Sequence, residues 1–169
     1  MSIGLEALRV LVADDNQHMR AILVVMLNSF GIKAIREVKD GADGVEALRR
    51  WPADLAVVDF QMEPVDGVAF TRLVRTAPDT PNPYLPIIML TGHSEMSRVT
   101  EARDAGVNEF IVKPLTAKVL VDRINACIYR QRPFIRCDTY FGPDRRRKED
   151  PYFSGPWRRE ADRQSGRRR

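Results

Sequence analysis

The sequence predicts an α/β fold in which a five-stranded parallel sheet is covered by helices on both faces. Apolar runs typical of buried strands alternate along the chain with segments of helical periodicity. Several of these runs are continuously apolar, as strands covered on both faces require. The chain has 169 residues, of which 44% are hydrophobic and 30% charged, a balance that suits one domain with an appended segment.

Five strand–helix units account for residues 7–132. The predicted strands are residues 7–15, 32–38, 54–60, 87–92 and 107–114. The predicted helices are residues 16–31, 40–51, 66–76, 94–106 and 116–132. The second strand alternates between apolar and polar residues, which favours one partly exposed face. A proline-rich loop, residues 77–86, separates the third helix from the fourth strand.

Residues with known positional preferences mark the helix ends. Gly31 stops the first helix, and Pro52 stops the second. Ser94 and Thr116 are predicted N-caps of the fourth and fifth helices. Gly106 follows the end of the fourth helix, where a left-handed residue is common.

Composition argues against several other classes of protein. No segment approaches the roughly 20 apolar residues of a membrane span. The N-terminus places Glu6 and Arg9 in its only apolar stretch, which makes a poor signal peptide, so we expect a cytoplasmic protein. Cys127 and Cys137 form no metal or redox motif and are expected to be reduced thiols. With only two histidines, a zinc site is not expected.

Polar residues follow several predicted strands at the point where each strand ends. The first strand ends in Asp14 and Asp15, the third reaches Asp59, the fourth reaches Thr91 and the fifth reaches Lys113. Because the carboxyl ends of parallel strands meet at one edge of a sheet, these side chains are expected to converge.

The chemistry of this set suits phosphoryl transfer. Three carboxylates in one pocket repel one another unless a cation joins them, and carboxylate oxygens suit Mg²⁺. Asp59 is then a candidate nucleophile toward phosphorus, since aspartyl phosphates are a known class of covalent intermediate. Thr91 and Lys113 would bind the phosphoryl oxygens.

Each residue also has an ordinary structural explanation. Asp14 and Asp15 could cap a helix, Asp59 could belong to a turn, Thr91 could be a simple β-former, and Lys113 a solvated charge. The common position of all five at the ends of successive strands favours the functional interpretation.

Four stretches resemble the receiver domain of two-component response regulators. They are VLVADDNQHMR, DLAVVDFQMEPVDG, PIIMLTG and GVNEFIVKPL, and the resemblance covers residues 7 to about 130. It implies a flavodoxin-like, doubly wound fold with five strands and five helices. It also implies a stand-alone signalling protein that switches protein contacts and catalyses only its own aspartyl phosphorylation and dephosphorylation.

The resemblance assigns a role to each residue at the strand ends. Asp59 would accept a phosphoryl group, and Asp14, Asp15, Asp59 and the backbone carbonyl of Gln61 would hold Mg²⁺. Thr91 would be the switch hydroxyl, and Lys113 would pair with the phosphoryl group.

Further positions follow from the same resemblance. Phe110 falls on the switch-aromatic position. Gln61 and His93 lie where the lifetime of the phosphate would be tuned. The Lys113–Pro114 peptide would be cis.

The sequence divides at residue 130 into a receiver domain, 1–130, and a C-terminal tail, 131–169, rich in arginine and aromatic residues. The tail holds 12 of the 27 basic residues but only 6 of the 23 acidic ones. Its two loosely similar segments, 140–146 and 152–159, each contain Tyr-Phe, Gly-Pro and Arg-Arg. We expect an irregular extension, and three roles stay open: docking to protein, disorder, or binding to nucleic acid or anionic membrane.

The main functional hypothesis is a single-domain response regulator. Its expected partners are a histidine kinase or phosphotransfer protein and an unknown output protein, with a homodimer left open. The alternatives are a phosphate shuttle in a phosphorelay and a regulator that binds nucleic acid through its tail. A phosphatase with an aspartate nucleophile is disfavoured because Phe60 and Gln61 follow Asp59 where a second acid is typical. A flavodoxin is disfavoured because the loop after the first strand is acidic.

Overall fold

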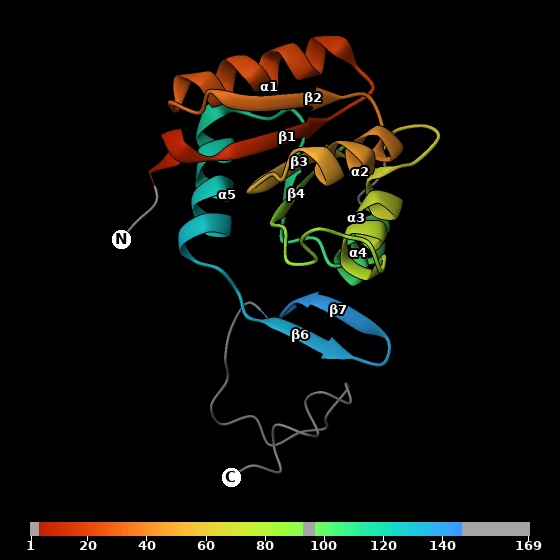
Figure 1. The fold of residues 1–169 in the computed structure, drawn as a ribbon. Coiled ribbons are helices and arrows are strands. Elements are labelled where there is room, and N and C mark those ends of the chain that lie inside the picture. Colours follow the sequence, from red (N-terminus) through yellow and green to blue (C-terminus); the bar gives the residue numbers. More distant parts are fainter. Residues whose placement is uncertain (1–3, 93–96, 147–169) are drawn as a thin grey trace.

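A computed structural model describes residues 4–92 and 97–146 of the chain (Figure 1). The strands are β1 (Arg9–Ala13), β2 (Ala34–Val38), β3 (Leu55–Asp59), β4 (Ile87–Thr91), β5 (Glu109–Val112), β6 (Phe134–Cys137) and β7 (Tyr140–Pro143). The helices are the 3₁₀ turn η1 (Leu5–Ala7), α1 (Gln17–Ser29), α2 (Gly41–Arg50), α3 (Gly67–Thr76), α4 (Val99–Ala105) and α5 (Ala117–Tyr129). None of these helices has the length and apolar character needed to cross a membrane.

The first five strands form one parallel sheet in the order β2-β1-β3-β4-β5. The chain moves from β1 outward to β2 and then returns to the other side of β1 to form β3. The predicted doubly wound sheet is therefore confirmed. This reversal of direction lies between β1 and β3, where ligands of open α/β sheets commonly bind.

Successive residues of the central strands face two different cores. Leu11 and Ala13 of β1 pack in the cluster formed with α2, α3 and α4. Val10 and Val12 pack in the cluster formed with α1 and α5. All four side chains are fully buried, because the sheet has a helical layer on each face (Figure 1).

The helix ends agree with the sequence prediction where the structure describes them. Thr116 caps α5 by accepting a hydrogen bond from Val119, and Gly106 ends α4 with a φ of 107°. Asp66 caps α3 by accepting from Ala69, which fixes the helix directly after the β3 loop. The α4 helix begins at Val99, later than expected, and the predicted cap Ser94 lies outside the described residues.

The prediction of an irregular C-terminal extension is wrong for residues 134–143. They form an antiparallel hairpin in which β6 pairs with β7 and Ile135 lies opposite Gly142. The Tyr140 hydroxyl donates to the Pro143 carbonyl at 2.6 Å, a hydrogen bond between the first and last residues of β7. The hairpin follows α5 and lies beside the ends of α3 and α4 (Figure 1). The first similar segment, 140–146, thus begins with β7, and the second, 152–159, lies outside the described residues.

Gly67, the first residue of α3, lies close to the backbone at the end of β3. A Cβ at Gly67 would lie 2.3 Å from the backbone oxygen of Asp59. Gly67→Ala is therefore expected to lower the free energy of unfolding by about 2–3 kcal/mol, as measured in urea. Lys118→Ala, on an exposed turn of α5, should change it by less than about 0.5 kcal/mol. Unchanged stability of Gly67→Ala would contradict this close contact.

Candidate functional site

The carboxyl ends of β1 and β3 bring three carboxylates together. Oxygens of Asp14, Asp15 and Asp59 all lie within 4.8 Å of one another. Asp14 and Asp59 are buried, whereas Asp15 is exposed. This agrees with the convergence that the sequence predicts and places the acids at the switch point of the sheet.

The two oxygens of Asp14 have different surroundings. Oδ1 accepts a hydrogen bond from the backbone N–H of Asn16 at 2.8 Å. Oδ2 is buried and has no hydrogen-bond partner among the described residues. A buried carboxylate oxygen without a hydrogen bond is costly, and a cation bound between Asp14, Asp15 and Asp59 would satisfy it. The donor set of hard oxygens therefore fits Mg²⁺.

Lys113 supplies the positive charge of the site. Its Nζ lies 2.7 Å from Asp59 Oδ1 and 4.0 Å from Asp14 Oδ2. Its backbone N–H donates to the Thr91 carbonyl at 2.7 Å, which holds the loop after β5 against the end of β4. The Lys113–Pro114 peptide is cis, as the resemblance implies.

Thr91 lies at the end of β4 with its side chain fully buried. Leu90, the residue before it, is the partner of Asp59 in the β3–β4 ladder. The Thr91 hydroxyl has no hydrogen-bond partner among the described residues, which is uncommon for a buried polar group. Thr91 thus adds an unsatisfied hydroxyl to the same edge of the sheet.

The remaining predicted residues lie around this centre or outside the described ranges. Phe110 of β5 is half-buried against the cluster that contains α2, α3 and α4, and it lies opposite Met89 in the β4–β5 ladder. Gln61 is exposed, two residues beyond Asp59. His93 lies outside the described residues.

Two arginines near the site were missed by the sequence prediction. Arg20 of α1 donates to the Asp14 carbonyl at 2.7 Å, and the Arg98 guanidinium lies 4.8 Å from the centre of the Phe60 ring. Arg20 follows Asp14 by six residues and bonds its main-chain carbonyl, a contact that the pattern of residue types does not indicate. Nothing in the sequence indicates the contact between Arg98 and Phe60, because it joins distant parts of the chain.

Burial and repulsion raise the pKa values of the two buried acids. Burial raises the pKa of Asp59 to about 6, even though its hydrogen bond with Lys113 lowers it, and the Asp14 charge raises it further. Burial also raises the pKa of Asp14, opposed by the Asn16 hydrogen bond. Both groups therefore favour a bound proton or a bound cation.

The fold and this edge of the sheet define a class of protein: a doubly wound α/β domain with an acidic, lysine-containing site of the kind used in phosphoryl transfer. The model of the response regulator receiver domain matches residues 10–125, so the chain belongs to that family of two-component signalling proteins. The hairpin lies beyond the matched range.

Named relatives agree with this assignment. The chain is 32% identical over 123 residues to the chemotaxis protein CheY of Pseudomonas aeruginosa, covering 73% of this chain and 98% of that protein. The receiver domain of a signal transduction histidine kinase from Syntrophus aciditrophicus superposes with a TM-score of 0.66 at 27% identity, over 73% of this chain and 92% of that one.

A second solved structure bears on the metal. It is the receiver domain of a sensor histidine kinase from Pseudomonas aeruginosa PAO1, with a magnesium ion coordinated in its active-site cleft. It has a TM-score of 0.63 and 27% identity, and the match covers 72% of this chain and 96% of that one. The cluster of Asp14, Asp15 and Asp59 matches the Mg²⁺ site of receiver domains.

The raised pKa of Asp59 makes a prediction about stability and pH. Because the folded protein holds this proton up to about pH 6 while the unfolded chain loses it near 3.8, stability falls as pH rises between these values. Without divalent cations, Asp59→Asn is expected to be more stable than wild type at pH 7.5, by roughly 1–3 kcal/mol, and the gain should shrink at pH 4.5.

Urea unfolding at both pH values measures this difference. Asp122→Asn, an exposed acid on α5, serves as the control and should leave the pH dependence unchanged. A gain for Asp59→Asn that is equal at the two pH values would contradict the buried-charge explanation.

Proposed function

We propose that this protein is a single-domain response regulator that accepts a phosphoryl group on Asp59 from a histidine kinase or phosphotransfer protein. The observation that carries the proposal is the position of Asp59. It ends a buried strand, lies within 4.8 Å of two further carboxylates, and contacts Lys113 at 2.7 Å.

This geometry and the family resemblance support roles for the neighbouring residues. A carboxylate oxygen of Asp59 would attack phosphorus while the bond from phosphorus to the donor's imidazole nitrogen breaks. Mg²⁺ held by Asp14, Asp15, Asp59 and the Gln61 backbone carbonyl would neutralise charge on the phosphoryl oxygens. Lys113 and the unsatisfied Thr91 hydroxyl would bind two of those oxygens.

The output would be a change in protein contacts on the face formed by α4, β5 and α5. When Thr91 moves toward the phosphoryl group, Phe110 has room to turn inward, and the two arrangements exchange population. Val112 and Val119 are each 37% exposed on this face, which supports a protein-binding role for it. A second copy of this chain, forming a homodimer, is one partner that this face would accommodate.

Other functions have less support. The described part of the tail is a hairpin packed on the domain, and this favours protein contact over a nucleic-acid arm. A phosphorelay shuttle would use the same site residues and differs only in its partners. The only reactions it would catalyse are the phosphorylation and dephosphorylation of its own Asp59. We propose that it acts in the cytoplasm.

Binding of beryllofluoride, a mimic of the phosphoryl group, tests the acceptor. With Mg²⁺ present, ¹⁹F NMR should show bound fluoride on the wild-type protein and on Asp122→Asn. Asp59→Asn should show none, because an amide does not replace the carboxylate that coordinates beryllium, and Asp14→Asn should need much more Mg²⁺. Bound fluoride on Asp59→Asn equal to that on wild type would overturn the assignment.

The switch is tested separately with Thr91→Ala. This variant is expected to bind beryllofluoride but to lose the change in hydrogen exchange that binding causes in α4, β5 and α5. A wild-type exchange response in Thr91→Ala would refute the switch role while leaving Asp59 as acceptor.

A further inference from the structure

The hairpin of residues 134–143 is packed on the receiver domain through its main chain. A Cβ at Gly142 of β7 would lie 2.8 Å from the Cα of Gly106, the residue that ends α4. Conversely, a Cβ at Gly106 would lie 2.9 Å from the Phe141 carbonyl oxygen. Two glycines therefore allow the two backbones to touch, a fit that a loosely attached tail would not need.

A buried arginine lies beneath this contact. Arg75 of α3 is only 3% exposed, yet it donates to the carbonyls of Gly106 and Pro83 at 2.9 and 2.8 Å and to Asn108 Oδ1 at 2.9 Å. Its guanidinium lies 5.0 Å from the centre of the Phe134 ring in β6. Phe134 of the hairpin therefore helps to bury the charged guanidinium of Arg75.

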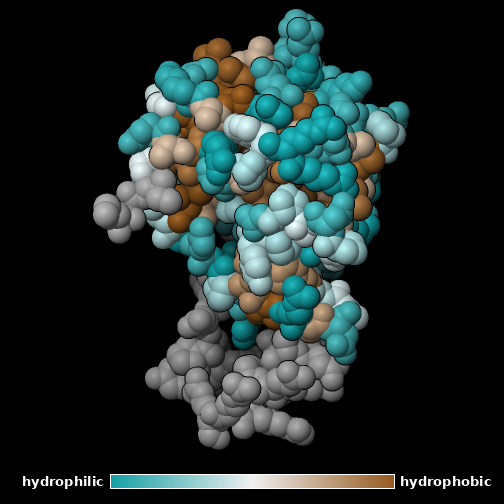
Figure 2. Space-filling view, viewed as in Figure 1, coloured by the Kyte–Doolittle hydropathy of each residue, from teal (hydrophilic) through white to brown (hydrophobic). Residues whose placement is uncertain are grey.

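Aromatic rings join the hairpin to the loop before β4. Tyr84 makes edge contacts with Phe134 and Phe141, with ring centres 5.1 and 5.3 Å apart. Phe134 and Phe141 contact each other at 5.5 Å. Hydrophobic residues reach the surface at the level of the hairpin as well as on the main body (Figure 2).

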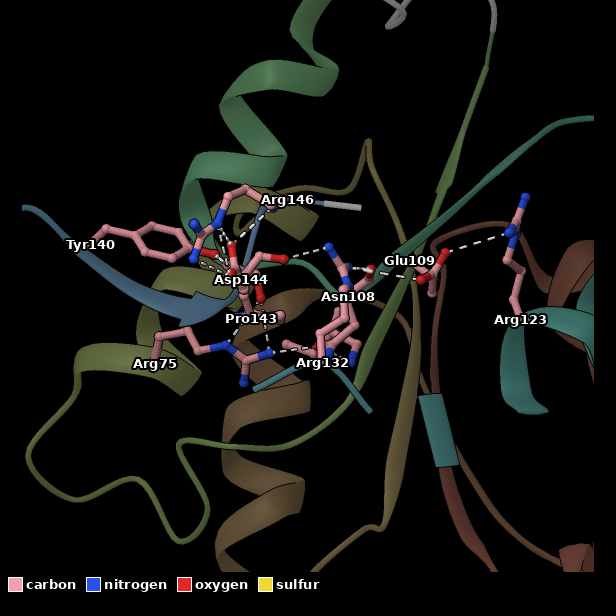
Figure 3. Close-up of polar contacts among 11 residues, drawn as sticks. Arg75, Asn108, Glu109, Arg123, Arg132, Tyr140, Pro143, Asp144 and Arg146 are labelled. Carbon is pink, nitrogen blue, oxygen red and sulfur yellow. Dashed lines mark hydrogen bonds and ion pairs between the residues drawn. The ribbon is translucent and has the colours of Figure 1, made fainter. Parts of the chain in front are cut away.

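Charged residues complete the attachment, and Figure 3 shows those around Arg132. Arg132, between α5 and β6, donates to the Asn108 carbonyl and to the Asp144 carbonyl at the far end of the hairpin. It also pairs with Glu109 at 3.8 Å. Arg145 pairs with Asp104 of α4, and its guanidinium lies 4.4 Å from the centre of the Tyr140 ring.

The hydrogen bonds of Arg75 and Arg132 both reach Asn108, at the starts of β4 and β5. The Asn108 side chain accepts from the backbone of Ile87, the first residue of β4, at 3.0 Å, and Asn108 directly precedes β5. The opposite ends of the same two strands carry Thr91 and Lys113. The strands have only five and four residues, so the two sets of contacts share short, hydrogen-bonded elements.

We propose that the hairpin is a built-in restraint on the phosphorylation switch: its docking and the phosphorylation of Asp59 weaken each other. The proposal rests on the function proposed above. The hairpin contacts fit the arrangement in which Lys113 pairs with Asp59 itself. Phosphorylation would draw Lys113 and Thr91 to new oxygens and displace β4, β5 and α4 from the positions that the hairpin fits.

Coupling of this kind is reciprocal. If beryllofluoride loosens the hairpin, then loosening the hairpin by mutation must strengthen beryllofluoride binding by the same factor. Couplings between sites are typically about 5–150-fold in affinity. For contacts that reach the site through two short strands, we expect roughly fivefold.

Gly142→Ala tests the coupling in the full-length chain without altering the phosphorylation site or the domain surface. Its Cβ would lie 2.8 Å from the Gly106 Cα and 2.6 Å from the Tyr140 hydroxyl, and these clashes should undock the hairpin. Arg145→Ala, which removes the Asp104 pair, provides a second and milder variant. Asp138→Asn at the exposed turn of the hairpin is the matched control.

Two measurements are needed with Mg²⁺: beryllofluoride affinity by ¹⁹F NMR and hydrogen exchange of residues 131–146. In wild type and Asp138→Asn, beryllofluoride should speed exchange in the hairpin. Gly142→Ala should exchange quickly from the start and bind beryllofluoride about fivefold more tightly, with Arg145→Ala intermediate.

The outcomes separate the two proposals. Failure of wild type to bind beryllofluoride would overturn the proposed function and this inference with it. Normal binding by wild type, with equal affinity in all four proteins or with no change in hairpin exchange, would overturn the coupling alone. If Gly142→Ala fails to fold, as judged by circular dichroism, Arg145→Ala against Asp138→Asn decides the question.

Discussion

The pairing of Lys113 with the buried Asp59 carboxylate, at 2.7 Å, is the interaction on which the site depends. Burial and the nearby Asp14 charge both act against ionisation of Asp59, and only the lysine among the described residues stabilises its charge. The arrangement keeps a reactive oxygen at the end of a rigid strand. It also explains why a divalent cation suits this edge of the sheet, since the cation would supply positive charge that Lys113 alone does not.

Strands β4 and β5, which end beside the site at Thr91 and directly before Lys113, are held at both ends. At their carboxyl ends, Thr91 and Lys113 are joined by a backbone hydrogen bond of 2.7 Å. At their amino ends, Asn108 links the start of β4 to Arg75, and Arg132 links Asn108 to the hairpin. Under the proposed function, the output would depend on small shifts of β4, β5 and α4, so an element that fixes their far ends would affect it. The hairpin, which lies beyond the family match, would be such an element.

Most of the fold was predictable because local patterns decide it. The continuous apolar runs of β3 and β4, the Thr116 cap and Gly106 each express a preference that holds wherever the residue occurs. The hairpin was not predictable in this way, because it is held by contacts with Tyr84, Arg75 and Gly106, which lie 28 or more residues before its first residue, Phe134.

For the site, the sequence by itself determined which residues gather at the sheet edge: Asp14, Asp15, Asp59, Thr91 and Lys113. Strand polarity brings these positions together in any parallel sheet of this order, so spacing was sufficient. Only the tertiary structure decided their chemical states. Whether an Asp14 oxygen lacks a hydrogen bond, whether Asp59 pairs with Lys113, and how far the pKa of Asp59 rises depend on burial and on distances between chain segments. The same reason applies to Arg75, which in the sequence is one arginine among many and in the structure is a buried charge beneath a hairpin.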